Sequence, residues 1–272
     1  MRPTSEKKNE RKREEGKKSI NWMLVLQVFF IMILLVLLSI TYSNWFLKKE
    51  NSYTPKLNVD PRKAALIDGI ALTKPNPSFT ESIRESLSKA NITLDVYKGE
   101  EVTIDLLKNV SGYGLLILRL HSAIDNHGFL YLFSAERFNE TEYNMRFSAD
   151  ERSTGAVREG RTFEDESYFA LRADLLGYMN YGGLNGSIMI LMGCNGTNSD
   201  HAINRLFDRG VRAIIAWDGY VDLDHTDNII ANLMKDVYEG GMNFPDAIKK
   251  IMSEEEPDLW GSKLHYLSPS GT

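Results

Sequence analysis

The sequence contains a single cysteine, Cys194, among its 272 residues. An intramolecular disulfide is therefore impossible, and the fold must depend on a hydrophobic core. No segment recurs with a period of about 20–50 residues, which argues against a solenoid or a propeller. No glycine-rich phosphate loop follows an apolar run either, because the nearest candidate, GCNGTN at 193–198, lacks the lysine and the spacing of such loops. The sequence thus predicts no bound cofactor.

Most of the chain has no excess of basic over acidic residues. The first twenty residues hold eight Lys/Arg against four Glu, whereas the rest holds 24 basic and 33 acidic residues. Such an acidic body lacks the basic face that nucleic-acid binding requires, so we expect no nucleic-acid partner. Residues 1–20 are predicted to be a disordered, basic cytoplasmic tail, the one part with the charge to contact anionic lipid headgroups.

The longest apolar run, Met23–Ile40, contains eighteen residues interrupted only by Gln27 and Ser39. As a helix it would measure about 27 Å, close to the thickness of a hydrocarbon core. The alternative, a cleaved signal peptide, has a shorter run of about 7–15 residues and a small-residue cleavage site, which this chain lacks. We therefore expect a signal anchor at 21–43 that spans the lipid bilayer of the cell membrane.

The orientation of this anchor follows from the distribution of basic residues. Because the Lys/Arg excess precedes the apolar run, the positive-inside rule places the N-terminus in the cytoplasm and the C-terminal domain on the extracytoplasmic side. Residues 44–61, which include Pro55 and Pro61, are predicted to be a linker, and 62–272 a single globular domain. Five N-x-[ST] sequons fit this exposure, with chance as the alternative explanation. They begin at Asn91, Asn109, Asn139, Asn185 and Asn195.

Within 62–272, apolar runs of strand length alternate with amphipathic helical segments. This order predicts an α/β fold with a mainly parallel central sheet covered by helices on both faces. Strands are predicted at 64–72, 92–98, 113–121, 187–193, 211–217 and 263–267. Helices are predicted at 78–90, 103–110, 167–179, 200–210, 226–241 and 244–252. A hairpin-like segment at 129–138 precedes an irregular polar insertion at 139–180.

Two of the most apolar predicted strands end in residues that could carry chemistry. The run LLILRLH ends at His121, and SIMILMG leads directly into Cys194. Reacting groups of open parallel sheets gather outside the carboxyl ends of the strands. If the two strands are neighbours, an imidazole and a thiol would face each other there, and a His-paired thiol is a potential nucleophile.

At these residues the sequence resembles the caspase-like cysteine peptidases, which include caspases, metacaspases, legumain, gingipains and CHAT-domain peptidases. In that family one apolar strand ends in the catalytic His, usually followed by Gly, and the next central strand ends in the nucleophilic Cys. LLILRLHS at 115–122 and SIMILMGCNG at 187–196 match those blocks, and the segment from VRAIIAWDG to FPDAI resembles CHAT-type and gingipain-type domains. The resemblance implies a caspase-like three-layer sandwich after the transmembrane helix.

The resemblance also implies roles for individual residues. Cys194 would be the nucleophile and His121 the general base, and the backbone N–H groups of Cys194 and Ser122 would form the oxyanion hole. Ser122 departs from the usual Gly. Asp68 and Asp218, at two predicted strand ends, would line a substrate pocket and favour cleavage after Arg or Lys. The implied function is a membrane-anchored cysteine endopeptidase acting on a protein or peptide substrate.

Two other groups of residues compete for functional roles. His127 precedes Gly128 but is predicted to lie in the loop beyond the strand end, so it ranks below His121 as the base. An acidic cluster follows the strand predicted at 211–217 and consists of Asp222, Asp224, His225 and Asp227. It lacks the spacing of a calcium-binding loop, and helix capping by Asp224 or Thr226 accounts for much of it. We predict no metal site.

Two alternatives to a peptidase remain. The same fold could serve as a catalytically inactive binding or adaptor domain at the cell surface, which the Ser122 departure and the sequon at Asn195 favour. The domain could also be an α/β sensor without Cys/His chemistry.

Overall fold

The computed structural model describes residues 22–50, 58–254 and 259–269. The chain divides into two compact units, Met1–Lys56 and Leu57–Thr272. The first unit contains helix α1 (Trp22–Glu50), which continues beyond residue 43, the expected end of the anchor, into the segment expected to be a linker from residue 44. Over the described residues, no helix combines the length and apolar character that crossing a membrane requires. The predicted tail at 1–20 lies outside the described residues.

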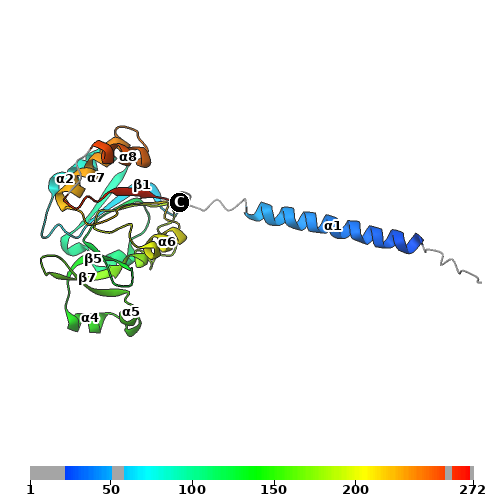
Figure 1. The fold of residues 1–272 in the computed structure, drawn as a ribbon, viewed down its shortest axis with the longest axis horizontal. Helices are drawn as coiled ribbons and strands as arrows, with labels where there is room; N and C mark the ends of the chain where they lie inside the picture. The colour runs from blue at the N-terminus through cyan, green and yellow to red at the C-terminus, as the bar shows by residue number, and fades with distance from the viewer. Residues whose placement is uncertain (1–21, 51–57, 255–258, 270–272) are drawn as a thin grey trace, which may run out of the picture. The chain divides into compact units, whose positions relative to one another are not determined.

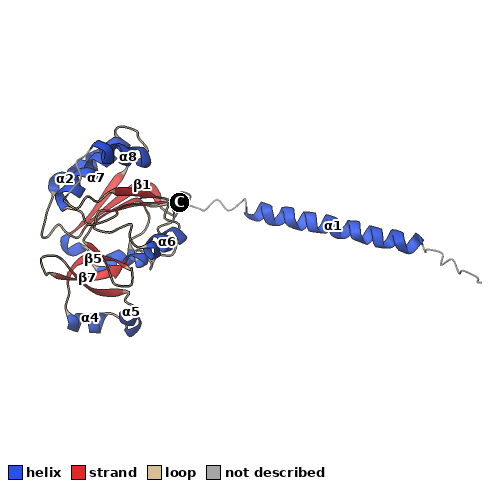
Figure 2. Cartoon of the chain, in the orientation of Figure 1, coloured by secondary structure: helices blue, strands red, loops and turns tan. Residues whose placement is uncertain are grey.

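The second unit is built on a six-stranded, mainly parallel sheet, as the sequence predicted (Figure 2). Its order is β10-β9-β8-β3-β1-β2, and only β10 runs antiparallel to its neighbour. The strands are β1 (Asp60–Asp68), β2 (Thr93–Lys98), β3 (Tyr113–Arg119), β8 (Ile188–Leu191), β9 (Ala213–Trp217) and β10 (Leu264–Leu267). The first strand begins two residues before Arg62, because Asp60 already pairs with Tyr113.

Helices cover both faces of this sheet (Figure 1). On one face lie α2 (Pro77–Lys89), α7 (Leu223–Tyr238) and α8 (Phe244–Glu254). On the other lie the shorter α3 (Ile104–Asn109) and α6 (Asp200–Asp208), with two 3₁₀ turns at Gly99–Glu101 and Ala173–Leu175. The start of α2 shows how the sequence sets these elements, since Asn76 accepts the Phe79 N–H and Pro77 occupies the first turn.

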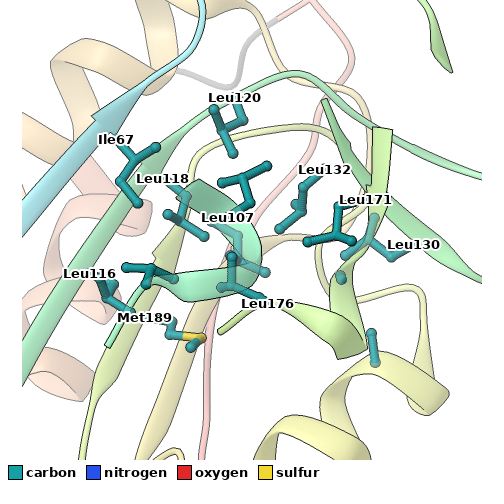
Figure 3. Close-up of a cluster of buried hydrophobic side chains, with 14 of the residues drawn as sticks. Ile67, Leu107, Leu116, Leu118, Leu120, Leu130, Leu132, Leu171, Leu176 and Met189 are labelled. Atoms are coloured by element: carbon teal, nitrogen blue, oxygen red, sulfur yellow. The ribbon is translucent and has the colours of Figure 1, made fainter. Parts of the chain in front are cut away.

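The central strands are apolar on both sides because each face packs against a separate core. In β3, Leu116 and Leu118 face the α3 and α6 side, where they pack with Leu107 and Leu132 (Figure 3). The intervening Leu115 and Ile117 join the core under α2, α7 and α8. Each such buried side chain contributes about 1.5–3 kcal/mol, so the middle of the sheet is held firmly at β3 and β8.

Much of the sequence that connects β3 to β8 forms a second, antiparallel sheet. Its order is β4-β5-β7-β6. Two short helices, α4 (Glu140–Arg146) and α5 (Ala149–Ser153), precede β6. The strands are β4 (Ser122–Ile124), β5 (Leu130–Arg137), β6 (Val157–Arg161) and β7 (Ser167–Arg172).

The α-helix expected at 167–179 is wrong, because only the short 3₁₀ turn at Ala173–Leu175 is helical in this segment. Residues 167–172 form β7, which pairs with both β5 and β6 and alternates between two apolar environments. Phe169 and Leu171 join the main core, whereas Tyr168 and Ala170 pack in a separate cluster with Phe133. The segment expected to be hairpin-like at 129–138 is the single strand β5, whose hairpin partner is β4.

Candidate active site

The two strands that end in His121 and Cys194 are direct neighbours in the sheet. β3 pairs in parallel with β8, with Leu118 opposite Leu191, and the Met192 N–H donates to Leu118 O at 3.0 Å. His121 and Cys194 each follow this matched pair by three residues. Because parallel strands end at the same edge, the adjacency on which the sequence argument depended is confirmed.

The two strand ends are tied together beyond the last ladder hydrogen bond. Ser122 Oγ donates to Cys194 O at 2.7 Å. The chain can approach so closely because residue 193 is glycine, since a Cβ there would lie 2.4 Å from Leu120 O and 2.3 Å from Ser122 Oγ. The side chain of Ser122 thus links the segment that carries the imidazole to the one that carries the thiol.

His121 and Cys194 line the same cleft, which has a volume of about 750 Å³. Ser122, Ala123 and Phe133 contribute to its wall beside them. The other lining residues come from four segments of the chain. They are Thr73, Lys74, Arg161, Thr162, Phe163, Glu164, Glu166, Tyr220, Val221, Asp222, Leu223, Asp224, Leu259 and Trp260. The cleft is large enough for several side chains of an extended peptide.

Cys194 is partly exposed at the point where β8 turns into a loop. Its Sγ lies 4.0 Å from Val221 O. The next residue, Asn195, has a φ of 58°, a left-handed conformation that asparagine tolerates better than most residues. The Asn195 N–H donates to Gly219 O at 2.7 Å, which holds this turn against the loop after β9. The turn presents the thiol to the cleft.

His121 is half-buried next to Phe133, with ring centroids 6.3 Å apart. Burial lowers the pKa of His121 below its ordinary value of 6.5, and the Arg119 cation acts in the same direction. The carboxylates of Glu164 and Glu166 raise that pKa and offset part of the burial effect. The imidazole is therefore neutral at pH 7, in the form that can accept a proton from a thiol.

The predicted oxyanion donors depend on the geometry of the short hairpin that begins at Ser122. The Phe133 N–H donates to His121 O at 2.9 Å, and Ser122 pairs with Leu132. Because hydrogen-bonded and non-hydrogen-bonded pairs alternate in an antiparallel ladder, the Ser122 N–H points away from β5. A role for this N–H and that of Cys194 at an oxyanion stays a prediction.

His127 lies outside the cleft, in the exposed turn between β4 and β5. Its Nδ1 is 3.6 Å from an oxygen of Asp125, which also accepts the backbone N–H groups of His127 and Phe129. Asp125 thus shapes the turn, and nothing among the described residues brings His127 to Cys194. The geometry favours His121 over His127 as the base.

Asp68, one of the two predicted pocket residues, is buried and does not line the cleft. It accepts from Arg119 Nη1 at 2.8 Å, and Asp227 accepts from Nε and Nη2 of the same guanidinium, each also at 2.8 Å. Arg119 Nη2 further donates to Lys74 O at 3.1 Å. Sequence reasoning missed Arg119, although an arginine inside an otherwise apolar strand was the available signal.

Asp218, the other predicted pocket residue, is also absent from the cleft wall. One of its oxygens lies 2.8 Å from His265 Nε2, and the other accepts the Lys263 N–H at 2.8 Å. The pKa of Asp218 is lowered despite partial burial, by the Lys263 N–H and by His265. This carboxylate fastens β10 beside β9, so substrate charge must be met by other residues.

The acidic cluster after β9 divides among three tasks. Asp222 caps α7 by accepting the N–H groups of Asp224 and His225, so the helix begins before the caps expected at Asp224 or Thr226. Thr226 Oγ1 instead accepts from Trp217 Nε1 at 2.9 Å. Asp222 and Asp224 face the cleft, and Asp227 binds Arg119. Within the described ranges, no group of His, Cys, Asp and Glu side chains is arranged to hold a metal ion.

The five sequon asparagines differ in exposure. Asn91, Asn109 and Asn139 are exposed, and the Asn139 side chain caps α4. Asn185 and Asn195 are partly buried. Because Asn195 directly follows Cys194, a glycan there would stand at the cleft.

The aromatic part of the cleft could not have been recognised from the sequence. Phe163, Tyr220 and Trp260 come from three separate loops, and their rings meet only in the folded chain.

No protein-family model matches this chain, and no curated protein is similar to it in sequence.

Proposed function

We propose that this protein is a membrane-anchored, extracytoplasmic cysteine endopeptidase with a caspase-like fold, in which Cys194 is the nucleophile and His121 the general base. The observation that carries the proposal is the adjacency of β3 and β8, which brings both residues to one cleft. The mainly parallel sheet with layers on both faces is compatible with the three-layer sandwich implied by the resemblance.

The chemistry proposed for this pair needs a neutral imidazole. Burial keeps His121 in that form at pH 7, so it can take the thiol proton as the sulfur attacks a peptide carbonyl. The proton is then available for the leaving amine, and water releases the acyl group in a second step. The backbone N–H groups of Cys194 and Ser122 would stabilise the oxyanion.

The support for the anchor is the sequence itself. An apolar run from Met23 to Ile40, preceded by the most basic part of the chain, is typical of a signal anchor with a cytoplasmic N-terminus. The acidic domain at 62–272 would then act outside the cytoplasm, where the exposed Asn91, Asn109 and Asn139 are open to glycosylation.

A second candidate function is a catalytically inactive binding domain of the same fold. It is favoured by Ser122, whose hydroxyl holds Cys194 O where the family usually has glycine, and by the sequon at Asn195. The two candidates differ in the reactivity that they require of Cys194.

Because Cys194 is the sole cysteine, an electrophilic thiol probe on the full-length protein reports on this residue alone. The peptidase predicts faster labelling in the folded protein than in the urea-unfolded protein at pH 7, and hydrolysis of a peptide library. His121→Ala should slow both, hydrolysis by about a hundredfold or more. His127→Ala is the matched control, since that imidazole lies outside the cleft. Labelling no faster than that of the unfolded chain, unaffected by His121→Ala, would establish the binding domain instead.

A further inference from the structure

Three aromatic rings meet on one side of the cleft. Phe163 stacks on Trp260 with centroids 6.5 Å apart and planes 11° apart. Tyr220 contacts both, at centroid distances of 5.4 Å from Phe163 and 5.5 Å from Trp260. We call these three residues the aromatic wall. They belong to the turn between β6 and β7, the loop after β9 and the segment before β10.

The aromatic wall is open to solvent even though its rings contact one another. Phe163 is 79% exposed, Trp260 54% and Tyr220 45%. Leu259 beside them is 87% exposed and also lines the cleft. Contiguous exposed apolar surface within a concave site is typical of a ligand contact and is unfavourable without one.

The charge around the aromatic wall selects what would bind it. Four carboxylates line the cleft, from Glu164, Glu166, Asp222 and Asp224, against two cations, Lys74 and Arg161. Three of these six groups, Asp222, Glu166 and Arg161, are engaged by other residues, and Asp222 caps α7. Glu166 accepts from Arg137 at 2.6 Å, and Arg161 pairs with Glu159 at 3.0 Å.

The carboxylates of Glu164 and Asp224 have no ion-pair partner within the described residues. Glu164 directly follows Phe163 of the aromatic wall, and Asp224 lies in the first turn of α7. The cleft therefore joins aromatic faces to uncompensated negative charge.

We propose that the aromatic wall and Glu164 form the subsite for a cationic side chain, lysine or arginine, of the peptide substrate. This inference rests on the proposed function and assigns its substrate class to residues other than Asp68 and Asp218. The apolar stem and the cation lie on the ring faces, and the carboxylates of Glu164 and Asp224 meet the charge.

Other side chains fit this surface less well. An acidic residue would meet like charge and the negative faces of the rings. A purely apolar residue would cover the rings but would remove water from Glu164 without replacing its hydrogen bonds, which is costly. A cation satisfies both features, and Trp is the most favourable ring for it.

The test uses the full-length Cys194→Ala protein, which cannot form an acyl intermediate, so that binding is measured apart from catalysis. Two fluorescent peptide libraries differ in one fixed residue, arginine or its neutral analogue citrulline. Fluorescence anisotropy should show about tenfold tighter binding of the arginine library, the effect of a cation–π contact with an added ion pair. Adding Trp260→Ala or Glu164→Gln should remove that preference.

Matched controls come from outside the cleft. Tyr181→Ala removes a fully exposed aromatic ring, and Glu85→Gln an exposed carboxylate on α2, so neither should alter the preference. Equal binding of the two libraries, or binding of neither, would overturn the subsite. The proposed function fails separately, through a Cys194 that neither labels nor hydrolyses peptides in the otherwise unaltered protein. A reactive enzyme with no preference for cations would refute only this inference.

Discussion

The proton on His121 is governed by groups that act in opposite directions. Burial and Arg119 disfavour the imidazolium, whereas the carboxylates of Glu164 and Glu166 favour it. Glu166 is largely committed to Arg137 and Tyr168, so Glu164 is the carboxylate whose removal alters His121 most directly. If the imidazole of His121 is neutral at rest, it removes the thiol proton as the sulfur attacks the substrate. Hydrolysis then requires the unprotonated form of His121, so its rate follows the titration of that imidazole.

This balance predicts the pH dependence of hydrolysis. Because the pKa of His121 is lowered, the acidic limb of kcat/KM should fall below pH 6.5. Glu164→Gln removes a charge that raises the pKa of His121, so the limb should move to still lower pH. A profile of kcat/KM between pH 4 and 8, about the range in which histidine titrates, checks both statements. A limb that moves upward in the variant would contradict this account of His121.

The buried Arg119 predicts a large effect on stability. Arg119→Met would leave the carboxylates of Asp68 and Asp227 buried without their cation, which costs about 3–5 kcal/mol. Burial already raises the pKa of Asp68 despite the guanidinium beside it. The free energy of unfolding, from urea titration of the full-length protein, measures the loss. Adding Asp68→Asn to Arg119→Met should restore part of the lost free energy of unfolding. A loss below about 1 kcal/mol in Arg119→Met, the range of an exposed ion pair, would show that the buried ion pairs of Arg119 do not stabilise the fold.

At the scale of elements, the site depends on how closely the ends of β3 and β8 approach. A Cβ on Gly193 would lie 2.4 Å from Leu120 O, a backbone atom that cannot rotate away. Accommodating it would separate the segments that carry His121 and Cys194. The strands themselves are fixed by closely packed side chains on both faces, so they cannot absorb the displacement. The segments beyond the strand ends must therefore move instead.

Gly193→Ala should therefore reduce hydrolysis by at least about tenfold, since small displacements of catalytic groups are costly, while the protein remains folded. The matched control is Gly128→Ala. Its Cβ would meet nothing within 4 Å, but its positive φ of 81° strains any side chain, so it tests a local backbone effect near the same hairpin. Peptide hydrolysis and circular dichroism on both variants are the measurements. Unaltered hydrolysis in Gly193→Ala would mean that the approach of the two strands is not needed.

The inner strands β3, β8 and β9 of the central sheet could be predicted from the sequence because they are apolar on both faces. Runs such as 113–121 and 187–193 leave few other options, and their alternation with helices along the chain predicted a mainly parallel sheet. β7 was mistaken for a helix because both of its faces are also covered, by two different clusters, which hides the period of two. Its partners β5 and β6 decide its structure, and such pairing is not visible in a single segment.

Some residues of the candidate site could likewise be predicted from the sequence, and others could not. His121 and Cys194 follow strands, so their shared edge could be deduced from topology. Asp68 also lies at a strand end, as the last residue of β1, but its partner Arg119, 51 residues away in the sequence, holds the carboxylate in the core. The aromatic wall is assembled from three loops, whose meeting depends on tertiary packing alone.

At the scale of the whole chain, charge and apolar residues are segregated along the sequence. A basic N-terminal segment, an apolar run and an acidic domain follow one another. An acidic domain that acts on cationic segments of its substrates would attract them over a distance of about 10 Å at 0.1 M salt. Its location relative to the membrane then decides which proteins it meets.

The last prediction concerns that location. Because the Lys/Arg excess precedes Met23–Ile40, residues 60–272 should lie outside the cytoplasm and the tail at 1–20 inside it. With an epitope at each end of the full-length protein, a protease added to intact cells should destroy the C-terminal epitope and spare the N-terminal one. Permeabilised cells are the control, in which both epitopes should be lost. Loss of only the N-terminal epitope from intact cells would reverse the orientation, and protection of both would place the domain in the cytoplasm, beyond reach of extracellular substrates.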